Sequence, residues 1–443
     1  MRSANLDSKR WLIAAMGTCL QICLGTVYAW SYFQKPLSTA FGWSESLVIW
    51  TFSLTIFCVG IAAAVGGVLL PKVGPRKLAM TGGVLFAIGY LTAAIALKSG
   101  SAPLLFLTYG AIGGCGLGLG YVTPVATVAK WFPDKKGLAT GIVVMGFALG
   151  ALFMSKIFAP ILFSSFGWEA AGDAAAQQSV LINVFLVLGV IFLVLTIPIG
   201  AMLQNPPENY APVGYTPPTV SGNTASGAGS ITAKESILSG RFFVMWLMFF
   251  CNLTAGVAIL GFQSSLFQDL WAKWAGDIGM SITKSQLAGY GATLIGITSI
   301  FNALGRFFWG GMSDKIGRAY VFRIMLGTQV FAFIAIAYVE NPWIFAALLC
   351  YVLLCYGGGF GTMPSFVSDV FGAKILPVVY GVMLTAWSAA GIVGPQIVAF
   401  FSDKIPDSAG FWSFKFGACI LAFGFLISFL SSNKPFEGKE ASK

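Results

Sequence analysis

A single arginine stands inside a long apolar stretch in the second half of the chain. Between Ser285 and Ser313 every residue is apolar or uncharged except Arg306. About 20 apolar residues cross a bilayer, so this stretch predicts a transmembrane helix. Arg306 precedes the charged run beginning at Asp314, and the spacing places it roughly 12 Å from that end of the helix. A guanidinium at that depth is costly unless it faces a wet cavity or a partner. With no acidic residue nearby in sequence, Arg306 predicts a binding site for an anion.

The chemistry that the sequence offers is that of binding rather than of catalysis. Guanidinium presents a planar fork of N–H donors that meets a carboxylate through two parallel hydrogen bonds. The chain contains no histidine, which removes the commonest proton shuttle and metal ligand. Its eight cysteines lie in apolar runs without metal-ligand spacing, so we interpret them as core residues. With no nucleophile–base pair in view, we expect neither an enzyme nor a cofactor or metal.

The composition is that of a polytopic membrane protein. Of 443 residues, 57% are hydrophobic and 9% charged, whereas soluble domains carry about 25% charged residues. We therefore predict an all-α membrane protein with twelve transmembrane helices. The predicted spans are 11–33, 46–70, 78–97, 102–128, 137–160, 178–203, 241–268, 285–312, 319–338, 342–368, 375–401 and 410–431.

The basic residues are distributed unevenly over the two sides of the predicted bundle. If both termini are cytoplasmic, 18 of the 26 lysines and arginines lie in cytoplasmic segments and seven lysines lie at or near the other side. Arg306, inside a span, is the remaining one. The acids divide equally between the sides. This bias is the positive-inside pattern of insertion topology. The net charge of +10 is thereby explained by a lipid bilayer, here a bacterial inner membrane, and calls for no nucleic-acid partner.

The chain repeats itself. At a shift of 240 positions Pro124 falls on Pro364, and at a shift of 243 Lys72 falls on Lys315 in a matching glycine hairpin. Such self-similarity predicts two halves of one architecture. Two parallel six-span repeats place a substrate site near the bilayer midplane, at the interface between the halves.

A polar segment separates the repeats. Residues 205–238 are rich in Pro, Gly, Ser, Thr and Asn and predict a cytoplasmic linker. The linker divides the chain into an N-terminal six-helix bundle, 1–204, and a C-terminal six-helix bundle, 239–443. Near its end, Thr232 and Glu235 have the spacing of a capping box and predict the start of a short helix.

These residues resemble the major facilitator superfamily. The superfamily signature, G-x(3)-D-[RK]-x-G-R, is met by Gly310 to Arg318 in the second half. The first-half copy has Pro71 where the acid is expected, although the run GPRK follows. The resemblance implies a gating loop on the cytoplasmic side, formed by Asp314, Lys315, Arg318 and Arg76.

A narrower resemblance is to the oxalate/formate antiporter family, which is related to the monocarboxylate transporters. It rests on LGTVYAWSYFQKPL (24–37), YGGGFGTMPSFVSDVFGAK (356–374) and YGVMLTAWSAAGIVGP (380–395). The resemblance implies that Arg306 binds the substrate carboxylate. The family's oxalate exchanger has a second buried cation, a lysine, where this chain has Trp387, so a monovalent anion is expected here.

The same resemblance suggests which side chains surround the substrate. Spans one, four, seven and ten are expected to line the cavity, with contributions from five, eight and eleven. The candidate binding residues are Arg306, Tyr28, Tyr121, Asn252, Asn302, Tyr356, Trp387 and Phe147. Each aromatic residue has the alternative of simple packing between helices, and Asn252 has that of a helix–helix hydrogen bond. Animal monocarboxylate carriers have an aspartate at the position of Asn302, where it takes part in proton coupling.

The leading functional hypothesis is a secondary active transporter of small monocarboxylates such as lactate, pyruvate or formate. It would work by alternating access as a monomer, and proton symport is the first coupling scheme. The main alternative is an oxalate/formate-type anion exchanger, an antiporter that needs no titrating side chain. A membrane enzyme, a channel and a nontransporting receptor are the rivals from other classes. The expected partners are thus a small organic anion and, for symport, a proton.

Overall fold

The structure is a computed structural model that describes residues 2–208, 210–212, 231–372 and 374–437. All regular elements in these ranges are helical, and together they form twelve helical segments that are long and apolar enough to span a membrane. The prediction of an all-α membrane protein with twelve transmembrane helices is confirmed.

Several spans consist of more than one helical element. In chain order the elements are α1 (Arg2–Gly25), η1 (Thr26–Ala29), α2 (Trp30–Phe41), α3 (Glu45–Val73), α4 (Pro75–Lys98), α5 (Ala102–Leu105), η2 (Phe106–Gly113), α6 (Gly114–Trp131), α7 (Lys136–Phe153), η3 (Met154–Phe158), α8 (Ala159–Ser165), η4 (Trp168–Ala170), α9 (Ala174–Met202), α10 (Ala233–Ile237), α11 (Gly240–Asp277), α12 (Lys284–Ile316), α13 (Arg318–Ile336), α14 (Pro342–Phe371), α15 (Leu376–Met383), α16 (Thr385–Lys404), η5 (Pro406–Ser408) and α17 (Ala409–Ser428).

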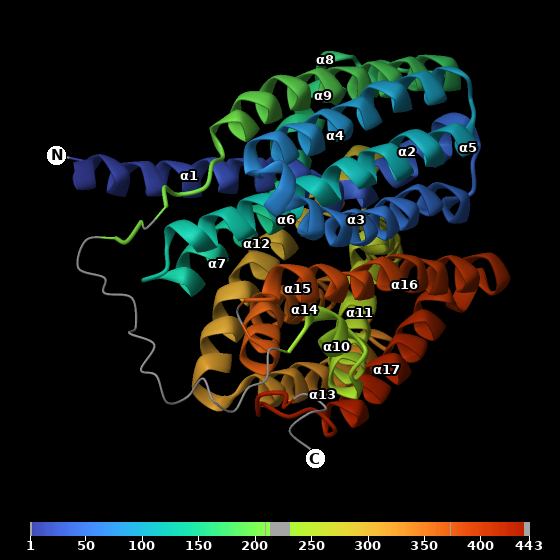
Figure 1. Cartoon of the computed structure of the whole chain (residues 1–443). Helices are drawn as coiled ribbons and strands as arrows, with labels where there is room; N and C mark the ends of the chain where they lie inside the picture. The colour runs from blue at the N-terminus through green and yellow to red at the C-terminus, as the bar shows by residue number, and fades with distance from the viewer. Residues whose placement is uncertain (1, 209, 213–230, 373, 438–443) are drawn as a thin grey trace.

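The helices form two bodies. Those from α1 to α9 gather in the upper part of Figure 1 and those from α11 to α17 in the lower part. The predicted linker, 205–238, is only partly described, since 209 and 213–230 lie outside the described residues. Its final part is α10, where the Thr232 and Glu235 side chains form both hydrogen bonds of a capping box. The short helix predicted there is confirmed.

Three spans of the first half change their helical winding partway along their length. The first span, predicted over 11–33, runs on to Phe41 through the tighter turn η1, which carries Tyr28. The fourth and fifth spans contain the wider turns η2 and η3. Such wider turns frequently occur at functional sites, and the apolar pattern of the sequence gave no sign of them.

Glycines bring α12 and α14 into backbone contact. A Cβ atom at Gly305 would lie 1.9 Å from the Leu354 carbonyl oxygen, and one at Gly361 would lie 2.3 Å from the Arg306 carbonyl oxygen. No side chain fits at either position, so these glycines set the closest approach of the two helices. Arg306 is thereby held directly against α14.

The two halves meet differently at the two ends of the bundle. With twelve spans both chain ends lie on one side, called here the terminal side. On the opposite side polar contacts join the halves: Lys35 pairs with Asp269 at 2.6 Å, Lys156 donates to Thr293 at 2.6 Å, and Ser285 donates to Glu169 at 2.9 Å. On the terminal side the halves meet through small residues and apolar side chains, as where Gly67 lies under the Pro377 carbonyl and Gly141 against the Phe307 ring.

Candidate functional site

Arg306 is buried near the middle of the molecule without a polar partner. Its residue is 3% exposed, and no nitrogen of its guanidinium forms a hydrogen bond with any described residue. Among the described side chains no carboxylate pairs with it either; its nearest characterised contact is the Phe360 ring, whose centroid lies 5.1 Å from Cζ. Stacking on a ring face stabilises a guanidinium only modestly. The cation is thus available to an anion.

Aromatic rings from both halves form a cage beside this guanidinium. Trp387 of α16 lies at the centre and makes edge contacts with Phe360 at 5.0 Å, Tyr121 at 5.5 Å and Phe147 at 5.8 Å between ring centroids. The aromatic cage comprises Tyr28, Tyr121, Phe147, Tyr356, Phe360 and Trp387, all of them buried. The predicted pairing of Phe147 with Trp387 is present.

One hydrogen bond crosses the cage from one half to the other. The hydroxyls of Tyr28, on η1, and Tyr356, on α14, lie 2.6 Å apart. Gly256 of α11 leaves room for the Tyr356 ring, because a Cβ atom at this position would lie only 2.1 Å from that ring. Span seven therefore contributes room to this part of the site rather than a side chain.

Three further polar atoms of the predicted site residues are buried and have no hydrogen-bond partner within the described ranges: Tyr121 Oη, Trp387 Nε1 and Asn302 Oδ1. The Tyr121 hydroxyl is close enough to Arg306 to interact electrostatically, although the two groups do not reach hydrogen-bond geometry. Asn302 lies one helical turn before Arg306 and packs on Gly357 of α14. Since buried polar groups are normally satisfied, these unpaired atoms are candidates for contact with a polar ligand.

Asn252 takes the alternative that the sequence left open. Its Nδ2 donates to the Cys355 carbonyl at 3.3 Å, and its Oδ1 accepts from Gln329 Nε2 at 2.9 Å. Both ends of the amide are used in joining α11, α13 and α14. These hydrogen bonds match the helix–helix alternative for Asn252, and its contact with substrate stays a prediction.

Sequence reasoning missed two residues beside Arg306. Phe360 supplies the ring next to the guanidinium, and Tyr380 of α15 lies within electrostatic range of both Arg306 and Tyr121. Tyr380 belongs to a stretch already singled out for its family resemblance, and a phenol inside a predicted span is a recognisable signal. Phe360 gave none, because one apolar ring in an apolar run looks like any other.

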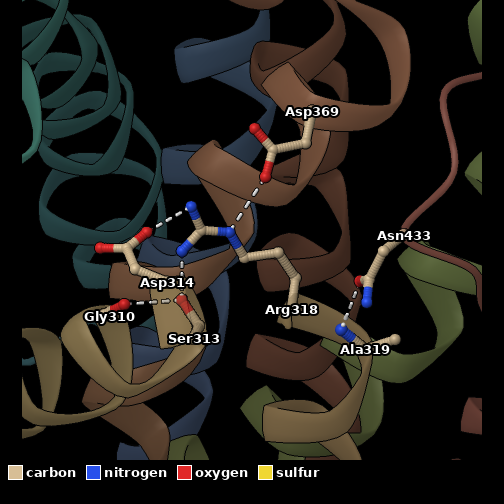
Figure 2. Close-up of polar contacts among 7 residues, drawn as sticks. All are labelled: Gly310, Ser313, Asp314, Arg318, Ala319, Asp369 and Asn433. Atoms are coloured by element: carbon tan, nitrogen blue, oxygen red, sulfur yellow. Dashed lines mark hydrogen bonds and ion pairs between the residues drawn. The ribbon is translucent and has the colours of Figure 1, made fainter. Parts of the chain in front are cut away.

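The gating-loop residues fall into two groups, and Figure 2 shows the second-half hairpin. Arg318 pairs with Asp314 at 2.5 Å and with Asp369 of α14 at 3.1 Å, and it donates to the Ser313 hydroxyl. Lys315 and Arg76 are exposed. Neither forms an ion pair with another residue of the described ranges, so the structure brings together only two of the four predicted gating residues.

Comparison with known proteins decides the family. The model of the Major Facilitator Superfamily matches residues 13–395. The chain belongs to this superfamily. As a facilitator it is an integral, multi-pass membrane transporter, and not an enzyme.

Relatives of this facilitator agree with the narrower resemblance. The oxalate:formate antiporter of Oxalobacter formigenes is 26% identical over 93% of this chain and 89% of its own. Monocarboxylate transporter 2 of Mus musculus is 24% identical over 91% of this chain and 80% of its own. The crystal structure of the facilitator FucP in the outward conformation matches with a TM-score of 0.64 at 16% identity, covering 96% of this chain and 99% of that one. The last match supports the fold alone.

Proposed function

We propose that this facilitator transports small monocarboxylates of the lactate, pyruvate or formate type by alternating access. The observation that carries the proposal is the unpaired, buried guanidinium of Arg306 at the aromatic cage between the halves. A carboxylate is the anionic group whose geometry best matches the guanidinium fork. The names of the relatives, an oxalate:formate antiporter and a monocarboxylate transporter, point to the same class of ligand.

Charge balance favours a singly charged substrate. Among the described lysines and arginines only Arg306 and Arg10 are buried, and Arg10 is paired with Asp134. One fixed positive charge balances one carboxylate, and the neighbouring position that could hold a second cation is occupied by the Trp387 ring. A second carboxylate would enter the cage unpaired, which is costly in a desolvated site.

The charge of the substrate also gives a reason for coupled movement. An empty, closed site leaves Arg306 desolvated and unpaired, whereas a bound carboxylate offsets part of that cost. The closed state between the two open ones is therefore reached more easily with substrate bound. We infer that both termini face the cytoplasm, in keeping with the distribution of basic residues. We also propose that the membrane is a bacterial inner membrane and that the protein acts as a monomer.

Two coupling schemes remain candidates. In proton symport the proton accompanies the substrate and can travel on its carboxyl group. In anion exchange no proton acceptor is needed, and this scheme is favoured by the composition of the cage, which within the described residues contains no carboxylate. A pH gradient imposed on proteoliposomes drives concentrative uptake under symport and has little effect under exchange.

The test of the substrate site is uptake of radiolabelled lactate and pyruvate into proteoliposomes. Arg306→Ala and Arg306→Lys should each lower uptake by about 100-fold or more, because a lysine cannot reproduce the bidentate fork. Arg323→Lys is the matched control: Arg323 also lies in the second half, but it binds the carbonyls of Ser428 and Ser431. Native uptake by either Arg306 variant would sink the proposal.

A further inference from the structure

A groove opens between the two halves on the side opposite the chain ends. Its volume is about 440 Å³, within the range of small-molecule sites. One wall is the start of α3 and the other is the end of α16. The side chains that matter below are Ser44, Ser46 and Trp50 on the first wall and Gln396, Phe400 and Asp403 on the second.

The groove begins where the contact between these two helices ends. α3 and α16 run side by side in Figure 1. The Ser388 hydroxyl donates to the Phe57 carbonyl at 2.7 Å, and nearer the groove Gln396 Nε2 donates to the Ser53 hydroxyl at 3.1 Å. Since Gln396 also lines the groove, this last hydrogen bond closes it on the membrane side. The groove is therefore bounded by both halves of the molecule.

The groove faces the surface of the molecule rather than the aromatic cage. Two rings of its lining, Trp50 and Phe400, are 38% and 57% exposed. Ile49 and Phe52, on another face of α3, are fully buried and lie against Gly261 of α11. Exposed aromatic rings near the end of a span are typical of the boundary between bilayer and water. The groove thus lies where lipid headgroups are found.

The polar groups of the two walls have opposite hydrogen-bonding character. On the α16 wall the Asp403 carboxylate is exposed and forms no ion pair within the described ranges, and no described lysine or arginine lines the groove. On the α3 wall the hydroxyls of Ser44 and Ser46 share one hydrogen bond at 2.9 Å, which leaves one hydroxyl hydrogen for a ligand. The indole N–H of Trp50 is a further donor. An ionised carboxylate, in contrast, only accepts.

We propose that this groove binds a phospholipid whose headgroup carries a primary ammonium, as phosphatidylethanolamine does. The ammonium donates to Asp403, and the phosphate accepts from the donors of the α3 wall. The acyl chains continue along the exposed rings of Trp50 and Phe400. An anionic headgroup fits less well, because it brings negative charge to Asp403 and no cation. Because α3 and α16 belong to different halves, the bound lipid contacts both. This inference does not depend on the substrate that Arg306 binds.

Lipid titrations followed by native mass spectrometry test the proposal on the delipidated full-length protein. Phosphatidylethanolamine, phosphatidylcholine and phosphatidylglycerol with identical acyl chains are compared. Phosphatidylethanolamine should bind about 10-fold more tightly than phosphatidylcholine, because the quaternary ammonium has the same charge but no N–H to donate. Phosphatidylglycerol should bind more weakly than phosphatidylethanolamine as well. Equal binding of phosphatidylethanolamine and phosphatidylcholine, or tighter binding of phosphatidylglycerol, overturns the proposal.

A set of acid variants locates the preference in the groove. Asp403→Asn removes the charge at nearly constant shape, so the preference for phosphatidylethanolamine over phosphatidylcholine should fall to within about 3-fold. Asp403→Glu keeps the carboxylate and should retain the preference. Asp407→Asn is the matched control, since Asp407 is equally exposed in η5 but does not line the groove. A native preference in Asp403→Asn, or an equal loss in Asp407→Asn, places the lipid elsewhere and overturns the proposed site.

Trp50→Phe tests the opposite wall, because it removes one donor and keeps an aromatic ring. Both zwitterionic lipids carry the phosphate that this donor contacts. The variant should therefore weaken phosphatidylethanolamine and phosphatidylcholine alike, by about 3-fold, and leave their ratio unchanged. Unchanged affinities, or a loss confined to phosphatidylethanolamine, contradict the assignment of the phosphate to the α3 wall.

Discussion

The two halves hold their site-bearing helices together at the terminal side with different residues. In the second half Arg318 joins α12 to α14 through Asp314 and Asp369. In the first half Arg10 of α1 binds Asp134, in the connection between α6 and α7, with Nη1 at 3.0 and 3.1 Å from the two carboxylate oxygens. Each clamp thus connects spans of its half that carry either Arg306 or members of the aromatic cage.

The hairpins themselves show that the turn does not require the clamp. Both turns reverse the chain at a single glycine with a positive φ, 83° at Gly74 and 95° at Gly317. The first-half hairpin does so with Pro71 at the position of the acid and with Arg76 exposed. The comparison shows that the glycine alone is enough to form the turn. The ion pairs instead connect neighbouring helices of the same half near the turn.

The clamps differ most in burial, and the largest expected effect follows from that. The Arg10 and Asp134 side chains are 11% and 18% exposed, and Arg10 also lies 4.9 Å from the Phe132 ring. Arg10→Ala leaves Asp134 largely buried beside Asp7, and breaking such a pair costs about 3 kcal/mol. We expect a clearly lowered thermal midpoint in detergent, measured by scanning fluorimetry. A shift no larger than that of Lys9→Ala, a half-buried neighbour on α1, contradicts this view of the first clamp.

Arg318→Ala should cost less. Its two partners are 65% and 50% exposed, so water and salt already screen the ion pairs. We expect a loss of about 1–2 kcal/mol, and 1 M salt should shrink the difference from the native protein. The Arg10→Ala difference should respond less to salt. Equal salt responses in the two variants would remove the proposed distinction between a buried and an exposed clamp.

A smaller effect is expected at the tail. Gly317 precedes α13 and has no side chain to cap it; Asn433 supplies the oxygen instead, accepting from the Ala319 amide at 3.0 Å (Figure 2). Asn433→Ala should cost about 1 kcal/mol, as loss of a helix cap does. Asn433→Asp keeps the acceptor and serves as the control. If Asp and Ala at this position lower the thermal midpoint equally, the capping role is wrong.

The smallest effect is expected from restoring the missing acid. Pro71→Asp places a carboxylate where the signature has one, yet the counterpart of Arg318 at the shift of 243 is Pro75, so the new charge gains no clamp. Compared with Pro71→Ala, which accounts for removing the proline, its stability should change by less than about 0.5 kcal/mol. A substantial gain over Pro71→Ala would mean that the acid alone organises the hairpin.

The sequence predicts the parts of the site whose chemistry stands out from its surroundings. Arg306 is conspicuous because a charge inside an apolar run has a large insertion cost. The twelve spans follow from hydrophobic length, and Tyr28 and Tyr121 stand out as hydroxyls among apolar neighbours. The arginine and the tyrosines were recognisable because each differs from what lipid or core packing requires.

The remainder depends on three-dimensional packing. Phe360 is 1% exposed beside Arg306, while Phe331, an identical side chain in a similar run, is 74% exposed. Only the approach of α12 to α14 through Gly361 separates their roles. Asn252 was equally undecidable, because its partner Gln329 lies on another span and the pairing exists only once the helices have packed.

The polar contacts that join the halves opposite the chain ends have an energetic consequence. When Lys35 separates from Asp269, both charged groups become hydrated, and this hydration compensates for most of the lost interaction free energy. When Gly141 withdraws from the Phe307 ring, apolar surface becomes exposed to water and no new interaction compensates for it. Separating the halves at the side opposite the chain ends therefore costs less free energy than separating them at the terminal side. Because temperature changes the strength of ion pairs and of apolar contacts by different amounts, heating should shift the resting population between the two open states.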